Sequence, residues 1–216
     1  MDGDGYPDIV SACTYGSCPG QIFNGNGAYQ FTPVTVANLN WPYIIGDFNG
    51  DGKKDIVSSG TLLNTGNRTF HQVPSGSLPL QSGALAVVAD FNGDGKDDVA
   101  INLPGERTIE VYYSKGDGTF YEASVIDPGL LPGVFVAGDF NGDGRIDIAI
   151  GSGLSYQVCL LFNNGNGQFS RSFFASGAFS APIIATDLNR SGKTDLVIAN
   201  YGFIFAPPNV NVVFHK

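Results

Sequence analysis

A nine-residue motif recurs five times along the chain and restricts the folds that the chain can adopt. In the copy at residues 139–147, oxygen-bearing side chains stand at motif positions 1, 3, 5 and 9, and a glycine stands at position 6. The final aspartates of successive copies are 43 to 49 residues apart. A period of this length indicates tandem structural repeats. These five final aspartates are Asp8, Asp55, Asp98, Asp147 and Asp195.

A second marker recurs in phase with the motif, a glycine-rich and asparagine-rich turn that ends in an aromatic residue. Its copies lie at residues 24–29, 64–70, 114–120 and 163–169. The runs between the markers are short and apolar or alternating, as in strands, and Gly or Pro interrupts every candidate helix. In the third repeat they predict strands at residues 86–89, 98–101 and 108–113, and a fourth strand that begins near Phe120.

Four short strands in each repeat predict an all-β fold, a β-propeller of four-stranded antiparallel blades. We expect a single domain or segment with repeat units at approximately residues 1–37, 38–80, 81–129, 130–178 and 179–216. The first unit lacks its first strand and the last stops after its third, so three blades are full and two are partial. A compact five-bladed ring and a segment of a larger propeller both remain open, and we favour the segment. A linear array of loops would not need apolar runs on both sides of each motif.

The motif also predicts calcium sites. Carboxylates and an amide at alternate positions suit a hard cation with six or more oxygen ligands, and the glycine permits the sharp turn that lets them converge. The backbone carbonyl at position 7 and water would complete the shell. The three complete copies are Asp47, Asn49, Asp51, Lys53 and Asp55; Asp90, Asn92, Asp94, Lys96 and Asp98; and Asp139, Asn141, Asp143, Arg145 and Asp147.

Two further copies are less complete. Their candidate ligands are Asp2, Asp4, Tyr6 and Asp8 in the first copy and Asp187, Asn189 and Asp195 in the last. Ser191 replaces the central aspartate of the last copy, which removes a negative ligand and should weaken that site. We therefore expect three Ca²⁺ sites and at most five.

Two other interpretations of the motif were weighed. An EF-hand needs a glutamate at position 12, where this chain has Ser58, Ile101 and Ile150, and a helix after the loop, where strand-forming residues follow. Asx-rich turns without a metal are the second interpretation. Turns alone do not require the complete pattern three times, so we favour calcium.

Composition argues against nucleic-acid and membrane partners and leaves one possible disulfide undecided. The net charge of −9 is concentrated in these loops, and no basic patch is available for a nucleic acid. No apolar run is long enough for membrane insertion. Cys159 lies in a strand-like run and is expected to be a buried thiol, whereas the sequence does not decide whether Cys13 and Cys18 form a disulfide.

Residues 46–57, Gly-Asp-Phe-Asn-Gly-Asp-Gly-Lys-Lys-Asp-Ile-Val, resemble the FG-GAP/VCBS repeat of integrin α-subunit propellers and of secreted bacterial and fungal proteins. The resemblance covers essentially the whole chain. It implies a propeller, commonly of seven blades, with calcium loops on one face and ligand sites on the other face or between blades. Five motifs fall short of seven, so closing the ring would need further blades or self-association.

We expect a calcium-stabilised binding module for carbohydrate or protein ligands, extracellular or at the cell surface, and not an enzyme. The rival hypothesis is a catalytic propeller that acts on polysaccharide as a lyase or glycoside hydrolase. The sequence carries no Gly-x-Ser-x-Gly elbow. Trp41, the only tryptophan, either stacks on a sugar or packs between blades.

Overall fold

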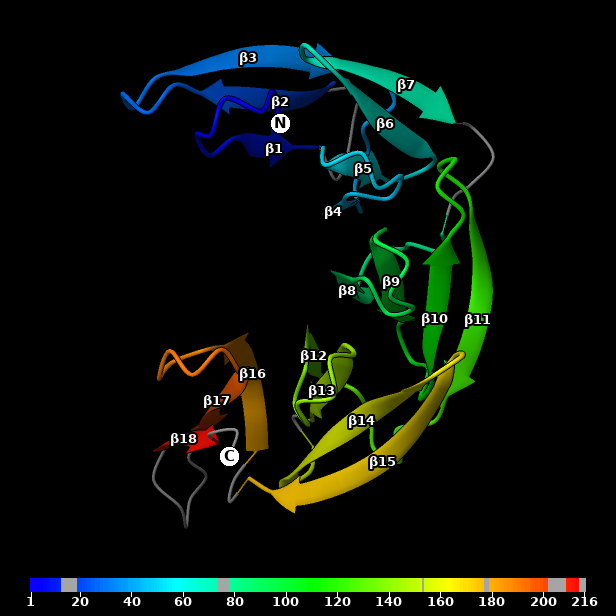
Figure 1. The fold of residues 1–216 in the computed structure, drawn as a ribbon, viewed down its shortest axis with the longest axis vertical. Helices are drawn as coiled ribbons and strands as arrows, with labels where there is room; N and C mark the ends of the chain where they lie inside the picture. The colour runs from blue at the N-terminus through cyan, green and yellow to red at the C-terminus, as the bar shows by residue number, and fades with distance from the viewer. Residues whose placement is uncertain (13–18, 74–77, 153, 177–178, 202–208, 214–216) are drawn as a thin grey trace.

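The computed structural model describes residues 1–12, 19–73, 78–152, 154–176, 179–201 and 209–213 (Figure 1). These residues form five antiparallel sheets, so the predicted all-β fold is confirmed. The same residues contain no helix that could cross a membrane. Cys13 and Cys18 lie outside the described ranges.

Each sheet is a meander in which strands follow one another in chain order. The first sheet contains β1 (Ile9–Ser11), β2 (Gly20–Gly25) and β3 (Phe31–Val36). The second contains β4 (Ile44–Gly46), β5 (Asp55–Val57), β6 (Thr61–Gly66) and β7 (Thr69–Val73). The third contains β8 (Leu85–Ala89), β9 (Asp98–Asn102), β10 (Ile109–Ser114) and β11 (Phe120–Ile126). The fourth contains β12 (Val134–Gly138), β13 (Asp147–Gly151), β14 (Gln157–Gly165) and β15 (Gln168–Ala175). The fifth contains β16 (Phe179–Thr186), β17 (Asp195–Tyr201) and β18 (Asn209–Val213).

The strands confirm the predicted division into three full and two partial blades. In the third repeat, β8 to β11 coincide with the four expected runs to within one residue. The first sheet begins with the strand that follows its motif, and the described part of the last sheet contains its first three strands. Four strands per full repeat is the arrangement of propeller blades.

The five sheets succeed one another around an arc, with the first and last sheets at its two ends (Figure 1). The first strands β4, β8, β12 and β16 contact one another in succession and line the inside of the arc. The fourth strands, such as β11 and β15, lie at the periphery (Figure 1). The loops that join first to second strands therefore begin near the centre of the arc.

The cores lie between neighbouring sheets, and the second strands of the three full blades, β5, β9 and β13, are buried on both faces. On β13, Ile148 and Ile150 pack in the core shared with the third sheet, whereas Ala149 packs in the core shared with the fifth. On β5, Ile56 packs toward the first sheet and Val57 toward the third. Alternating side chains point to opposite faces of a strand, so a strand between two sheets must be apolar throughout.

Candidate functional site: the motif loops

Each complete motif forms the loop between the first and second strands of its sheet, anchored by the aromatic residue at position 2. Phe48 and Phe91 are buried in the cores beside their loops. The glycines at positions 4 and 6 adopt positive φ, 75° at Gly50 and 84° at Gly52. Glycine takes this conformation most readily. In the last motif Arg190 stands at position 4 with φ of 59°, whereas Gly192 keeps position 6, so the glycine at position 6 is the one common to all these turns.

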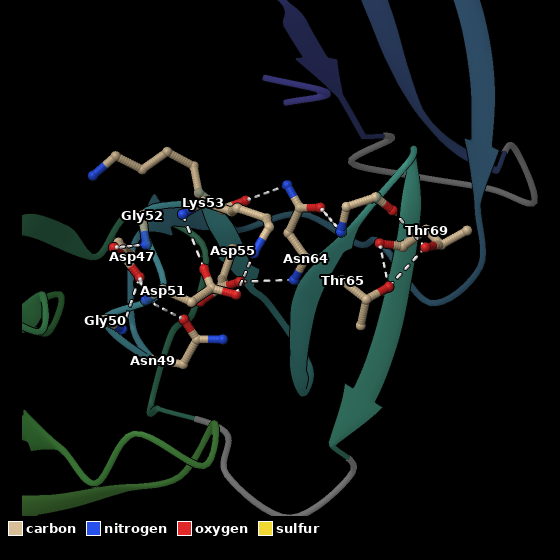
Figure 2. Close-up of polar contacts among 12 residues, drawn as sticks. Asp47, Asn49, Gly50, Asp51, Gly52, Lys53, Asp55, Asn64, Thr65 and Thr69 are labelled. Atoms are coloured by element: carbon tan, nitrogen blue, oxygen red, sulfur yellow. Dashed lines mark hydrogen bonds and ion pairs between the residues drawn. The ribbon is translucent and has the colours of Figure 1, made fainter. Parts of the chain in front are cut away.

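The aspartate at position 1 organises the loop by accepting three backbone N–H groups (Figure 2). Asp47 Oδ1 accepts from Gly50 at 2.8 Å and Asp51 at 3.1 Å, and Oδ2 accepts from Gly52 at 2.8 Å. Asp90 and Asp139 accept the corresponding three N–H groups in their loops. The predicted first ligand is therefore also the centre of the turn.

Positions 3 and 5 add Asx turns and an ion pair. Asn49 Oδ1 accepts the N–H of Asp51 at 3.0 Å, and Asp51 Oδ1 accepts the N–H of Lys53 at 2.9 Å. Lys53 Nζ lies 2.8 Å from Asp51 Oδ2, and this contact holds the pKa of Asp51 below its usual value. The other two complete loops contain the same pair, Lys96 with Asp94 at 2.7 Å and Arg145 with Asp143 at 2.5 Å. The motif predicted a role only for the carbonyl at position 7, and this side-chain contact was not predicted.

The aspartate at position 9 is fully buried and ties the loop to the third strand. Asp55 Oδ2 accepts the N–H of Phe48 at 3.0 Å. Its Oδ1 accepts the N–H of Asn64 at 2.7 Å (Figure 2). Asp98 and Asp147 make the equivalent two bonds. Burial raises the pKa of Asp55 to about 6 and that of Asp98 to about 7, although the N–H donors favour the charged form.

A side chain on the third strand joins each of these loops to the preceding sheet. Asn163 Nδ2 donates to the carbonyl of Phe91 at 2.7 Å, and Ser114 Oγ donates to the carbonyl of Phe48 at 2.5 Å. Asn64 Nδ2 donates to the carbonyl of Met1 at 2.8 Å. The motif pattern does not predict these contacts, although each donor is the first residue of the second marker.

The loop residues suit a hard cation in their chemistry, since three carboxylates and one amide stand on a single turn. Burial is the main reason for the raised pKa of Asp55, and the negative charges of Asp51 and Asp47 raise it further. A divalent cation bound here would remove this repulsion between the carboxylates. The oxygens nevertheless accept backbone N–H groups here. Among the residues that the structure describes, no group of three or more His, Cys, Asp or Glu side chains is placed to hold a metal ion. The structure thus shows the hydrogen-bonded form of the loops, and their metal ligands stay predictions.

A sequence profile of the FG-GAP-like repeat matches residues 1–58, 90–150 and 139–198. The chain belongs to the FG-GAP-like repeat family. No curated protein sequence matches it significantly.

A solved structure shares the architecture of this FG-GAP-like chain. It is a lectin of Agrocybe aegerita, described by its specific recognition of non-reducing terminal N-acetylglucosamine. The two share 23% sequence identity with a TM-score of 0.66, over 99% of this chain and 64% of the lectin chain. The chain therefore spans somewhat less than two thirds of that lectin. The likeness extends over all five sheets and confirms the predicted propeller-type fold.

The two incomplete FG-GAP-like motifs keep part of the hydrogen bonding. In the first, Asp8 Oδ1 accepts the N–H of Gly25 at 2.9 Å and its carboxylate pairs with the Met1 amino group. Asp4 Oδ1 accepts the N–H of Tyr6 at 2.9 Å, as an Asx turn does. The side chain of Asp2 pairs with Arg68 of the second sheet at 2.9 Å, so this predicted ligand already contacts a cation.

The last FG-GAP-like motif forms the same turn without its central aspartate. Asp187 Oδ1 and Asn189 Oδ1 both accept the N–H of Ser191, at 3.0 and 2.9 Å. Asp195 Oδ2 accepts the N–H of Leu188 at 3.0 Å. The turn therefore depends on positions 1, 3 and 9, whereas the carboxylate at position 5 adds the ion pair of the complete loops.

Proposed function

We propose that this chain is a carbohydrate-binding module whose motif loops bind Ca²⁺. The observation that carries the proposal is the likeness in fold of 99% of the chain to a sugar-binding lectin. Membership of the FG-GAP-like family supports a binding role rather than an enzymatic one. The lectin's recognition of terminal N-acetylglucosamine suggests the first ligands to test, the chitooligosaccharides.

The charge of the chain favours neutral glycans. The formal net charge is −9, and a protein of this sign repels sulfated or sialylated sugars at long range. Neutral sugars are instead held by aromatic faces and by amide and hydroxyl groups. We therefore expect the chain to bind neutral glycans in preference to anionic ones.

Calcium would bind the side chains at positions 1, 3, 5 and 9 and the carbonyl at position 7 of each complete loop. It would supply positive charge where the carboxylates of Asp47, Asp51 and Asp55 repel one another. Lys53 now provides part of that charge at Asp51, so the cation and the lysine compete. Weak sites of this kind, with Kd of about 10⁻⁴ to 10⁻³ M, suit the calcium levels outside cells, which supports an extracellular or cell-surface location.

A glycan array measured with calcium and with chelator tests the proposal. We expect binding to neutral glycans, with weaker binding or a lower melting temperature in chelator. A parallel assay for polysaccharide degradation tests the catalytic alternative. Release of products without measurable glycan binding would overturn the binding-module function.

A further inference from the structure

We infer that the second repeat carries a single binding site for a neutral pyranose ring on the indole of Trp41, at the end of the sheet away from the motif loop. This inference rests on the proposed carbohydrate role and specifies where that role is performed. Trp41 precedes β4, and the motif loop follows β4, so the two lie at opposite ends of the strand. Ser58 and Ser59 follow β5, which pairs antiparallel with β4, so they return to the end where Trp41 lies.

Trp41 is held in place but remains half exposed. Its ring packs edge-to-face on Tyr43, with centroids 5.8 Å apart, and 48% of the residue is accessible. Tyr43 is fixed in turn, because its hydroxyl donates to the carbonyl of Val10 at 2.8 Å. Trp41 is therefore not part of an inter-blade core, which decides between its two predicted roles in favour of an accessible aromatic. A rigid aromatic face can cover the apolar face of a sugar ring at little entropic cost.

Polar groups border a small pocket beside the indole. The pocket has a volume of about 250 Å³ and is lined by Asn40, Trp41, Pro42, Ser58, Ser59, Leu78 and Leu80. Asn40 Nδ2 donates to Ser59 Oγ at 3.2 Å, which places an amide and a hydroxyl together at the rim. Both groups can donate and accept hydrogen bonds, as sugar hydroxyls require. The lining contains no charged side chain, so the chemistry fits a neutral sugar.

The third and fourth repeats lack this site. At the position of Trp41, six residues before the motif, the third and fourth repeats have Ala84 and Gly133. At the position of Ser58 they have Ile101 and Ile150, both fully buried. In the second repeat, the polar Ser58 thus stands where the other two repeats have a buried isoleucine, at the end of the sheet where Trp41 lies. This combination indicates a ring-sized site in the second repeat that the third and fourth do not share.

A larger groove, of about 710 Å³, is lined by the first motif and by the second sheet with its motif loop, and includes Met1, Tyr6 and Lys54. Its shape depends on the first residues of the chain. The Trp41 pocket is instead built by the second repeat alone. Its volume lies just below the range of about 300 to 1,000 Å³ common for larger ligands, which suits a single ring.

Intrinsic fluorescence reports on the site directly, because Trp41 is the only tryptophan. The wild-type chain is titrated with N-acetylglucosamine, galactose, mannose and chitobiose, and with glucuronic acid as the anionic comparison. We expect a saturable change in emission with at least one neutral sugar and none with glucuronic acid. Calorimetry with the same sugar then compares variants: Trp41→Ala should weaken binding about tenfold or more, Trp41→Phe less, and Ser59→Ala by a few-fold.

Tyr121→Ala is the matched control, because Tyr121 is also 48% exposed and packs edge-to-face on another tyrosine, with centroids 5.7 Å apart. It should bind the sugar as the wild type does, and all variants should keep the wild-type melting temperature to within a few degrees. Glycan binding on the array with unchanged Trp41 emission, or equal binding by Trp41→Ala, would overturn this site and leave the carbohydrate role intact. Absence of any glycan binding would overturn the carbohydrate role and this site with it.

Discussion

The side-chain amide of Asn163 donates a 2.7 Å hydrogen bond to the backbone carbonyl of Phe91, 72 residues earlier in the chain. The bond joins the fourth sheet to the motif loop of the third. Asn163 is also bonded to the motif loop of its own sheet. Its backbone N–H donates to Asp147, and its side-chain amide donates to the carbonyl of Ile146 at 3.0 Å. One residue therefore links two successive motif loops, so the carboxylate-rich motifs are joints between blades.

The first prediction concerns this link. Asn163→Ala leaves the buried carbonyl of Phe91 without its side-chain donor, so we expect a loss of about 1 to 3 kcal/mol in the free energy of unfolding. Asn164→Ala, at the exposed neighbouring position, should cost less than about 0.5 kcal/mol. Urea denaturation measures both. Equal stabilities for the two variants would show that the link does not stabilise the arc.

The second prediction concerns the buried aspartate at position 9. Asp98→Ala removes the acceptor of two buried N–H groups, those of Phe91 and Ser114, and should destabilise the chain by about 3 kcal/mol. Asp98→Asn keeps one carbonyl oxygen and should be intermediate. In chelator, Asp94→Ala in the same loop removes only exposed contacts, the pair with Lys96 and hydrogen bonds from the Lys96 N–H and the Asn92 amide, and should cost less than about 1 kcal/mol. A larger cost for Asp94→Ala than for Asp98→Ala would contradict the assigned roles.

The third prediction concerns calcium. Chelator should lower the melting temperature and added Ca²⁺ should restore it. At a calcium concentration one hundred times Kd, each site should add up to about 2.7 kcal/mol to the free energy of unfolding. Asp143→Ala should reduce this response, because it removes the position 5 carboxylate of one complete loop. Ser191→Asp, which restores the carboxylate missing from the last motif, should increase it. Differential scanning calorimetry that shows no response to either chelator or calcium would exclude these loops as sites.

The fourth prediction concerns Cys159, which is fully buried as expected from its strand-like surroundings. Burial raises the pKa of its thiol from 9.0 to about 11. The thiol is more acidic when unfolded, so its contribution to stability is present below pH 9 and is lost as the pH rises toward 11. In a Cys13→Ser, Cys18→Ser background, the remaining thiol should react with a disulfide reagent only on unfolding. Adding Cys159→Ala to this double variant should reduce the loss of stability between pH 9 and 11. Rapid labelling of the thiol in the native protein would refute its burial.

Much of the fold could be predicted from local patterns. The spacing of Asp55, Asp98 and Asp147, and the turns in phase with them, define four short strands per repeat, and the strands lie where expected. These features are local, because strand alternation and glycine turns depend on residues close in sequence. The same patterns predicted that the first sheet begins with the strand after its motif, as β1 does.

The candidate sites were predicted less completely. The motif identified the acidic residues at positions 1, 5 and 9 of the complete loops but not Asp97, which accepts the N–H of Asp47 at 2.7 Å and pairs with Lys54. The final aspartate is a buried acceptor whose donor, such as Ser114 for Asp98, lies 16 residues away. The basic side chain at position 7 was overlooked because only its carbonyl was considered. The exposure of Trp41 depends on how Tyr43 packs against the neighbouring sheet.

The amino-acid sequence by itself determined the repeat, the strands and the loops, because each arises from contacts within about fifty residues. The tertiary structure alone decided that Asn163 binds Phe91, that Asp98 is buried and that Trp41 faces solvent. These properties depend on which sheet packs beside which, and neighbouring sheets bring together residues that no local pattern relates. The nine-residue motif therefore predicts where the blades bend, and the packing of the blades decides what each of its side chains contacts.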